Sequence, residues 1–338
     1  MLNGFGDMAQ HLGLRRHATS LRKATTVLSH ELTTGQVKDQ TKHLRGDFSE
    51  LVAIDTSIAK ATSRVAVGQS IATWLSVQQN SVAVLRDHAQ TGFDDMLLLQ
   101  QAPENEQKQR MLSGMDTRFG DMVKLLNTSF GDRFVFSGTR ADAPAVAEAD
   151  VMLDALMNEI NAASPAITEA QELSDFIDQW FATGGGFDEV GYLGDAPIPA
   201  SQSLAQGYSV GISVTAQHEA VRQTFAAFAK GAALSRGVFE DDATEQKRFT
   251  DIATMAMGGS RSSLIQLAAE IGTSEERVQN ANAQNEAERY AMKIARSELL
   301  EADPYERASQ LERAMTQQEM IYSLTARLSR LTLLDFLR

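Results

Sequence analysis

The sequence contains no cysteine among its 338 residues. Disulfide bonds, thiolate zinc sites, iron–sulfur clusters and cysteine nucleophiles are therefore excluded. A chain of this length allows two or three ordinary domains, or one long helical body with an insert. Its stability must come from side-chain packing.

The sequence also lacks a long hydrophobic run. No segment approaches the roughly 18 uninterrupted apolar residues of a membrane-spanning helix, so we expect no membrane insertion. The N-terminus lacks the apolar core and cleavage site of a signal peptide. Four basic residues (Arg15, Arg16, Arg22 and Lys23) stand between Asp7 and Glu31 without an acid. Transit peptides and membrane-surface helices share this charge pattern, but the periodicity described below favours a helix that packs against a partner.

Aromatic residues are scarce, at 7% of a chain that is 43% hydrophobic. A composition rich in alanine and methionine suits helix packing better than a β-sandwich. The net charge is −13, and no basic stripe extends over a full domain. This balance predicts no nucleic-acid partner, and solubility alone explains the acidity.

Heptad spacing dominates the first 130 residues. Steps of four and three form one stripe from Leu14 to Leu32 and a second from Leu51 to Met96, which no proline interrupts. A helix of about fifty residues would be ~75–80 Å long, at ~1.5 Å per residue. A third stripe runs from Met111 to Ser129. The short turn at Pro103 predicts that the second and third helices pack antiparallel.

The last hundred residues return to the same spacing. A stripe from Leu264 to Leu299 predicts one long helix, and Pro304 marks a joint before a final helix. Helices with such stripes at the two chain ends need partners, and they can pair if the chain doubles back. The face that we expect to mediate assembly consists of Leu14, Leu21 and Leu28 in the first helix and Ile321, Leu324, Leu328 and Leu331 in the last.

The middle of the chain has a different character. Shorter helical patterns alternate with loops rich in glycine and proline, and "YSVGISV" alternates like a strand. We therefore predict a mainly α fold of long heptad helices that form a coiled-coil rod bundle from both chain ends, with a β-hairpin after the third helix and a small α+β insert. The predicted parts are a terminal assembly helix (1–35), a rod bundle with the hairpin (36–146), the insert (147–240), the returning rod (241–303) and a second terminal assembly helix (304–338).

The stretch "GDRFVFSGTRADAPAV", residues 131–146, interrupts the helical period. Phe134 and Phe136 stand two positions apart, so in a strand their side chains point to the same face. Gly138 suits a turn, and Pro144 would close it. We expect a hairpin whose aromatic face docks on the helices.

Catalytic motifs are missing. The six histidines include no pair at i, i+4, and "FSGT" is not the nucleophile elbow of hydrolases. The glycine-rich stretch from Thr183 to Gly191 lacks the lysine of a phosphate loop and predicts a flexible connector. We therefore expect no catalytic residue, no cofactor, no metal site and no enzymatic activity.

Three segments together resemble the bacterial flagellin superfamily, and especially the hook-associated proteins of the hook–filament junction. They are "GDRFVFSGTRADAPAV", "SHELTTG" at residues 29–35 and the C-terminal "ASQLERAMTQQEMIYSLTARLSRLTLLDFLR". The resemblance covers roughly the first 145 and the last 95 residues. Flagellins usually follow the first helix with a segment like "LRINSASDDPAG", whereas this chain has "QVKDQTKHLRGDFSEL", which favours the junction proteins over flagellin.

The resemblance implies a structural protein that the flagellar type III apparatus exports without a cleaved signal. Its copies would form a ring, in contact with a neighbouring hook-associated protein and with flagellin. It also implies an export chaperone that binds the C-terminal helix. Three alternatives remain open from the sequence: flagellin itself, a secreted binding or enzymatic module carried by the insert, and a cytoplasmic coiled-coil adaptor.

Overall fold

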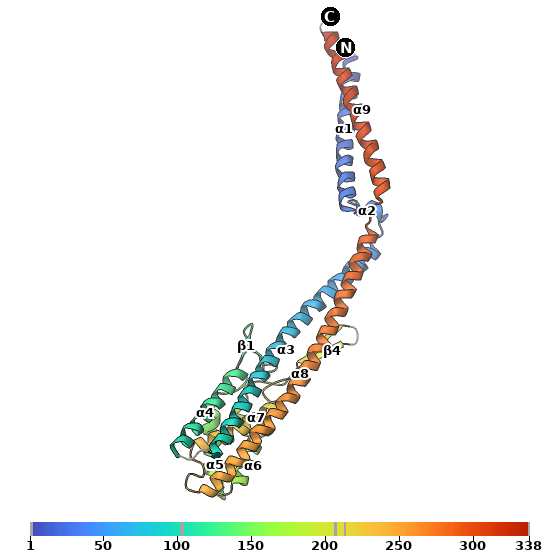
Figure 1. Ribbon diagram of the computed structural model, residues 1–338. Coiled ribbons are helices and arrows are strands. Elements are labelled where there is room, and N and C mark those ends of the chain that lie inside the picture. Colours follow the sequence, from blue (N-terminus) through green and yellow to red (C-terminus); the bar gives the residue numbers. More distant parts are fainter. Residues whose placement is uncertain (1–2, 102–104, 206–207, 213, 337–338) are drawn as a thin grey trace. The chain divides into compact units, whose positions relative to one another are not determined.

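The computed structural model describes residues 3–101, 105–205, 208–212 and 214–336. The chain divides into two compact units, one of residues 63–285 and one of residues 1–62 together with 286–338. Two long helices, α3 (Ser49–Gln101) and α8 (Ala243–Leu299), supply residues to both units (Figure 1). The mainly α fold class predicted from the sequence is confirmed.

The unit of residues 63–285 is built on antiparallel long helices. α3 has 53 residues and α8 has 57, and neither is broken within its bounds, as the uninterrupted heptads predict. Gln100 of α3 donates a hydrogen bond to Thr254 of α8 at 3.1 Å, whereas Gln90 meets Arg261 further along the chain. These pairs run in opposite directions along the sequence, so the two helices are antiparallel.

The third predicted helix is α4 (Asn105–Leu126). Asp95 near the end of α3 forms an ion pair with Arg118 in α4, so the chain reverses between them. This arrangement confirms the antiparallel packing that the short turn at Pro103 predicts; Pro103 itself lies outside the described residues.

The middle of the chain forms further short elements in the same unit. These are α5 (Ala149–Ala162), α6 (Ala170–Phe181), a π-helical turn η1 (Phe187–Gly191), the antiparallel pair β3 (Ile198–Ala205) and β4 (Tyr208–Ile212), and α7 (Glu219–Ser235). The expected flexible connector at 183–191 is wrong for the part that forms η1. Phe187 is fully buried there, with its ring 5.6 Å from the rings of both Phe181 and Phe225, so packing fixes this turn.

The centre of the core is α7. Most of its residues are buried, and alanine predominates among them, which lets neighbouring helices approach closely. Its Phe225 lies 5.3 Å from Phe119 of α4, measured between ring centroids. The core of this unit is therefore continuous from the long helices into the middle segment.

The hairpin exists, but it lies earlier than the sequence predicts. β1 (Ser129–Phe130) pairs with β2 (Arg133–Phe134), and Gly131 and Asp132 form the turn with φ values of +56° and +59°. Positive φ at both central residues is typical of the two-residue hairpin turn whose twist matches that of the flanking strands.

The four residues predicted to form the hairpin, Phe134, Phe136, Gly138 and Pro144, lie mostly outside its strands and turn. Phe134 ends β2 and is half-buried, whereas Phe136 lies beyond the strand and is fully buried. Gly138 has φ +68°, and a Cβ there would lie 2.3 Å from the carbonyl oxygen of Asp195. Glycine is required here because the backbone of residues 195 and 196 lies too close for a side chain, and not because of the hairpin turn. Pro144 is exposed and belongs to no strand.

The unit of residues 1–62 and 286–338 contains α1 (Asn3–Thr34), α2 (Gln40–His43) and α9 (Pro304–Phe336), as well as the ends of α3 and α8. Pro304 begins α9, as the predicted joint requires. A small core of Val37, Leu51, Leu300 and Ala302 lies where these elements meet. None of the helices in the described part of the chain is both long and apolar enough to cross a membrane.

Candidate assembly interface

The two terminal helices pair with each other. Near the start of α9, the N–H of Ala302 donates to the carbonyl of Gly35 at 2.9 Å. Further along, Arg22 of α1 donates to the hydroxyl of Tyr322 in α9 at 2.8 Å. The order of these contacts makes α1 and α9 antiparallel, so the chain doubles back as the heptads predict (Figure 1).

Backbone hydrogen bonds join the chain where α1 ends to the chain where α9 begins. Gly35 directly follows α1 and has a φ of +70°, the left-handed conformation in which helices commonly end. The N–H of Val37 then donates to the carbonyl of Leu300 at 2.9 Å, and the His43 ring lies 3.1 Å from the carbonyl oxygen of Leu299. Strand-like pairing of residues 35–37 with 300–302 therefore fixes where α1 and α9 begin to run side by side.

One buried carboxylate links three segments at this base. Glu31 of α1 is 5% exposed, and its side chain accepts the backbone N–H of Lys38 at 2.8 Å. The same carboxylate pairs with Nε of Arg307 in α9 at 3.3 Å. A buried charge is tolerated only when it is paired and hydrogen-bonded, and Glu31 meets both conditions.

The apolar face predicted for assembly is partly covered by the pair. Leu28 is buried, whereas Leu14, Leu21 and Ile321 are half-buried. Leu324 is 48% exposed. Leu328 and Leu331 belong to α9, but their side chains lie outside the described residues. Pairing within one chain therefore leaves part of this face open.

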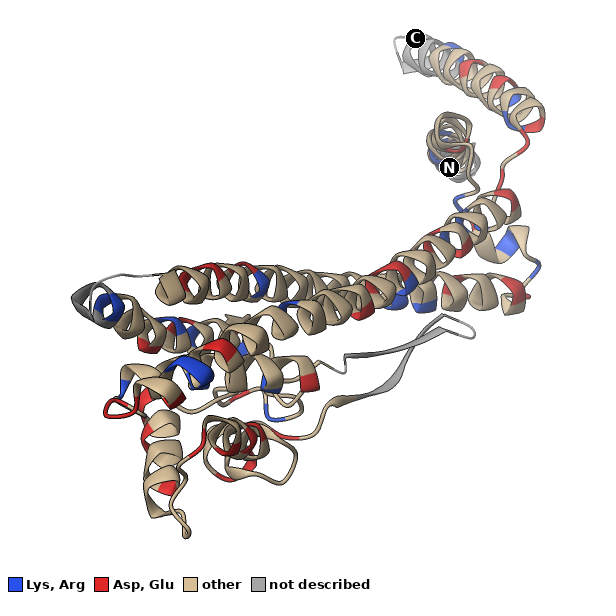
Figure 2. Ribbon diagram, turned by 60° about the horizontal axis from the view of Figure 1, so that its bottom comes forward, with Lys and Arg blue, Asp and Glu red and all other residues tan. Residues whose placement is uncertain are grey.

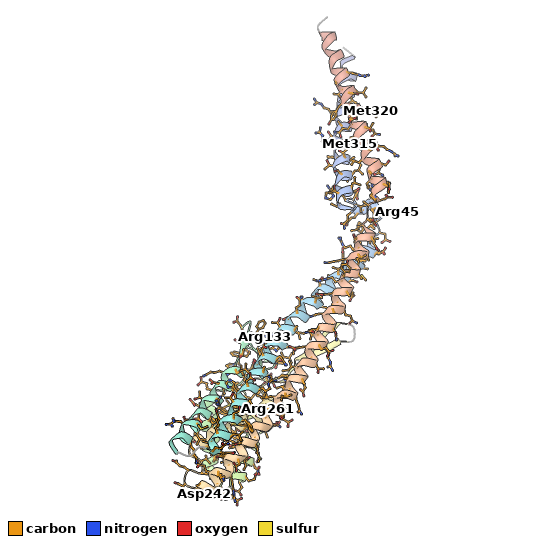
Figure 3. All side chains as sticks on the ribbon, in the orientation of Figure 1. Arg45, Arg133, Asp242, Arg261, Met315 and Met320 are labelled. Atoms are coloured by element: carbon orange, nitrogen blue, oxygen red, sulfur yellow. The ribbon has the colours of Figure 1, made fainter. Side chains whose placement is uncertain are left out.

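An unfilled groove accompanies these exposed residues. It has a volume of about 440 Å³ and is lined by Thr25, Thr26, Ser29, Leu311, Met315 and Gln318. Met315 and Met320, labelled in Figure 3, are each about half exposed on α9. Two helices alone do not close this surface, and exposed apolar residues in such number are typical of a protein-interaction face.

The outer side of α1 is basic. Arg15, Arg16 and Lys23 line a shallow hollow with Thr19 and Ser20, and all five side chains are exposed. Arg22 turns instead to Tyr322, and this hydrogen bond lowers the pKa of the Tyr322 hydroxyl. The basic stretch seen in the sequence is thus the surface of a helix that packs on α9 through its other side.

A buried glutamine that sequence reasoning missed anchors the segment after the hairpin. Gln78 of α3 is fully buried, and its Nε2 donates to the carbonyls of Val135 at 3.3 Å and Val214 at 2.9 Å. One amide group thereby joins two segments that are far apart in sequence. The sequence contains no signal that singles out Gln78, because the polar residues Gln79 and Asn80 follow it directly in α3.

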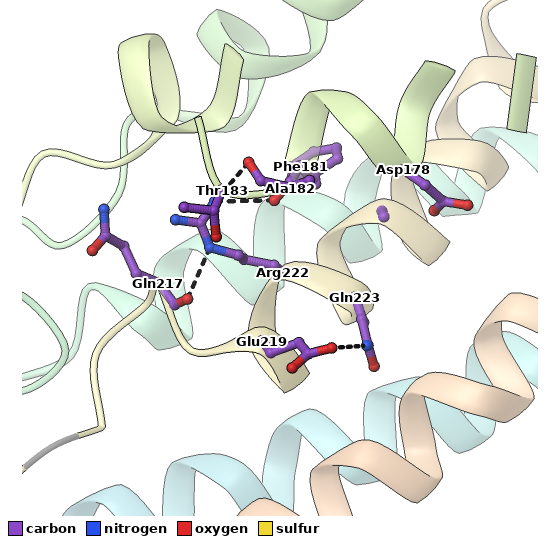
Figure 4. A pocket seen from close by; sticks show the side chains of 9 residues that line it. Asp178, Phe181, Ala182, Thr183, Gln217, Glu219, Arg222 and Gln223 are labelled. Carbon is purple, nitrogen blue, oxygen red and sulfur yellow. Dashed lines mark hydrogen bonds between the residues drawn. The ribbon is translucent and has the colours of Figure 1, made fainter. Parts of the chain in front are cut away.

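The described residues contain no group of three or more histidine or acidic side chains that could hold a metal ion. A cavity of about 360 Å³ lies between α6 and α7, and its lining includes Phe181 and Arg222 (Figure 4). Arg222 in that cavity is fully engaged in structural hydrogen bonds, so it is not positioned for chemistry.

A family model and solved structures are similar to this chain. Residues 254–337, which include the whole of α9 and much of α8, match the family described as the bacterial flagellin C-terminal helical region. A solved structure from Vibrio parahaemolyticus, assigned as a flagellar hook-associated protein, shares the fold with a TM-score of 0.52 and 15% sequence identity. That likeness covers 73% of this chain and 95% of the Vibrio chain.

A second solved structure, Bacillus cereus FlgL, has a TM-score of 0.49 and 10% identity, and covers 73% of this chain and 100% of its own. No curated protein sequence matches the chain. Over residues 254–337, the match to the bacterial flagellin C-terminal helical region confirms the resemblance that the sequence analysis predicts.

Proposed function

We propose that this protein is a structural subunit of the bacterial flagellum that joins the hook to the filament. One observation carries the proposal. The segment that matches the flagellin C-terminal region includes α9, which pairs with α1 yet leaves Leu324, Met315 and Met320 exposed. A helix pair with an apolar face that one chain does not cover is suited to packing against further copies.

Burial of the exposed apolar residues would supply the free energy of assembly. Each fully buried leucine or isoleucine contributes about 1.5–3 kcal/mol relative to an exposed one. Isolated helices are marginal in water and gain order from packing. Assembly would therefore stabilise α1 and α9 while it covers their remaining apolar residues.

The proposal includes partners and location. Copies would form a ring in contact with a neighbouring hook-associated protein and with flagellin, outside the cell. Export would follow the flagellar type III route without a cleaved signal, and a chaperone would bind the C-terminal helix before assembly. The protein would act through packing alone, without enzymatic activity.

A deletion strain tests the proposal. Loss of the gene should leave hooks without filaments, with flagellin released into the medium. Expression of the full-length chain from a plasmid should restore filaments. Normal filaments in the deletion strain would rule out a junction role.

Flagellin itself is the second candidate, because the matched C-terminal region is the one that flagellins have. Seeded polymerisation separates the two functions. A junction protein should not elongate purified filament fragments, whereas a flagellin should. Elongation that increases with the concentration of this protein would favour flagellin.

A further inference from the structure

The charge of this protein is unevenly distributed. Residues 148–245 contain sixteen aspartates and glutamates but three lysines and arginines, a net charge of −13. The whole chain also carries −13, so the rest of the sequence is neutral overall. Asp and Glu are drawn in red in Figure 2.

The three basic residues of this segment are all used internally. Lys230 is buried and pairs with Asp178 at 2.8 Å, and Arg222 is buried and pairs with Asp188. Arg236 is bound by Asp154 at 2.6 Å and by Asp116 at 3.3 Å. These cations are turned into the fold, so the surface of the segment is dominated by carboxylates. Such a surface attracts cationic partners from a distance.

One cavity opens on this surface, at the C-terminal end of α6 and the first turns of α7 (Figure 4). Its volume of about 360 Å³ accommodates a side chain. Two of its lining residues, Phe181 and Ala226, are buried and apolar. The other lining residues are polar or exposed: Asp178, Ala182, Thr183, Gln217, Glu219, Arg222 and Gln223.

Arg222 does not make this cavity an anion site. Its Nε donates to the carbonyl of Gln217 at 2.8 Å, and its Nη1 donates to the carbonyls of Phe181 at 3.0 Å and Ala182 at 3.2 Å. Its Nη2 is bound to Asp188. The guanidinium thus satisfies the last carbonyls of α6, which is a structural role.

The carboxylates of the cavity are more accessible. The side chain of Asp178 is 54% exposed, although one of its oxygens pairs with Lys230. Glu219 lies in the first turn of α7, where the helix dipole favours a negative charge. One oxygen of Glu219 accepts a hydrogen bond from Nε2 of Gln223 at 3.0 Å (Figure 4). Among the described residues, no lysine or arginine forms an ion pair with Glu219.

We propose that this cavity receives a lysine or arginine side chain from a basic segment of a partner protein. The aliphatic stem would lie over Phe181 and Ala226, and the cationic head would meet Asp178 and Glu219. Lysine and arginine fit because they combine an apolar stem with a charged end. This inference does not depend on the proposed flagellar function.

The test uses the full-length protein and synthetic probes in titration calorimetry. The probe is a capped peptide of alternating lysine and alanine, and its control replaces each lysine with glutamine. The lysine peptide should bind and weaken as salt rises, because exposed charges are screened. The glutamine peptide should not bind. Failure of the lysine peptide to bind at low salt would overturn the proposal.

Three variants distinguish binding in the cavity from attraction by the negative charge of the whole surface. Glu219→Gln should weaken binding about threefold to fivefold, the range expected for one exposed ion pair. Glu172→Gln removes the same charge from an exposed position of α6 that does not line the cavity, and it should leave binding nearly unchanged. Thr183→Phe, at an exposed lining residue, should block the cavity without a change in charge. Equal weakening by both glutamine variants, with no effect of Thr183→Phe, would show that only the surface field acts.

Discussion

The carboxylate of Glu31 in α1 lies 3.3 Å from the guanidinium Nε of Arg307 in α9, and the two residues tie the terminal helices together at their base. The same carboxylate accepts the backbone N–H of Lys38. A single side chain therefore connects α1, the segment after it and α9.

Glu31→Ala should loosen the terminal pair. The substitution leaves the Lys38 N–H and Arg307 without their partner, at a cost of about 1–3 kcal/mol for a buried polar group left unsatisfied. Hydrogen exchange of the α1 amides should accelerate, whereas that of α7 should not change. Glu312→Ala, at an exposed position of α9, is the matched control. Equal protection of α1 in both variants would contradict the role given to Glu31.

Leu324→Asp should block assembly without unfolding the subunit. Leu324 is 48% exposed, so a charge there costs the monomer little, but burial of that charge against another copy would be unfavourable. The expected result is an unchanged melting temperature and loss of filaments in the complemented deletion strain. We expect the same loss for Leu328→Asp. Ser323→Asp, one position away from Leu324, should retain filaments, and filaments from all three variants would show that this face is not the interface.

Gly68→Ala should destabilise the packing of α3 against α8. A Cβ at Gly68 would lie 1.9 Å from Oδ1 of Asn282, which is itself buried without a hydrogen-bond partner. Overpacking of this kind costs about 1–3 kcal/mol. Chemical denaturation should show a lower free energy of unfolding, and a second substitution, Asn282→Ala, should recover much of the loss.

The control for Gly68 is Gly272→Ala in α8, where an added Cβ would have no atom within 4 Å. Alanine is favoured over glycine inside a helix, so this variant should gain about 0.5–1 kcal/mol. Opposite signs at the two positions would identify packing as the cause. A loss of similar size at both would point instead to helix flexibility.

Acidification should weaken the turn around Asp188. Burial opposes its ionisation, but hydrogen bonds from the Gly184 N–H, Arg222 and Gln217 outweigh burial and hold the pKa of the Asp188 carboxyl below its usual value. A lowered pKa in the folded state stabilises the protein above the unfolded pKa of about 4, and this stabilisation is lost as the pH falls through the lower folded value. The free energy of unfolding of Asp188→Asn should therefore depend less on pH below about 4 than that of the parent chain. Urea titrations at several pH values measure both, and parallel curves would contradict the assignment.

Helix lengths and ends could be predicted because they are local properties. The four–three spacing and the absence of proline are sufficient to predict α3 and α8, and Gly35 and Pro304 lie where α1 ends and α9 begins. The pairing of the terminal helices also followed, since both have apolar stripes that need cover. Contact between other copies and the exposed faces of α1 and α9 stays a prediction.

Features that depend on contacts between distant residues could not be predicted. The sequence around Gly138 predicts a hairpin turn, but the constraint on this residue comes from the carbonyl of Asp195, more than fifty positions later. The glycines near 184–186 predicted a flexible connector, whereas Phe187 packs on Phe225 and holds the turn. The sequence around Gly138 and Phe187 does not indicate which distant residues, Asp195 and Phe225, they contact.

The buried position of α7 limits how the middle of the chain could be exchanged. Nearly the whole of this helix is enclosed, and its Phe225 packs on Phe119 of α4. Removal of residues 147–240 would thus expose the apolar side of α4 to water rather than yield a shorter working protein. Substitutions and engineered insertions should be tolerated best in the exposed loop of residues 163–169. A graft that replaces the middle segment must supply its own helix in the position of α7.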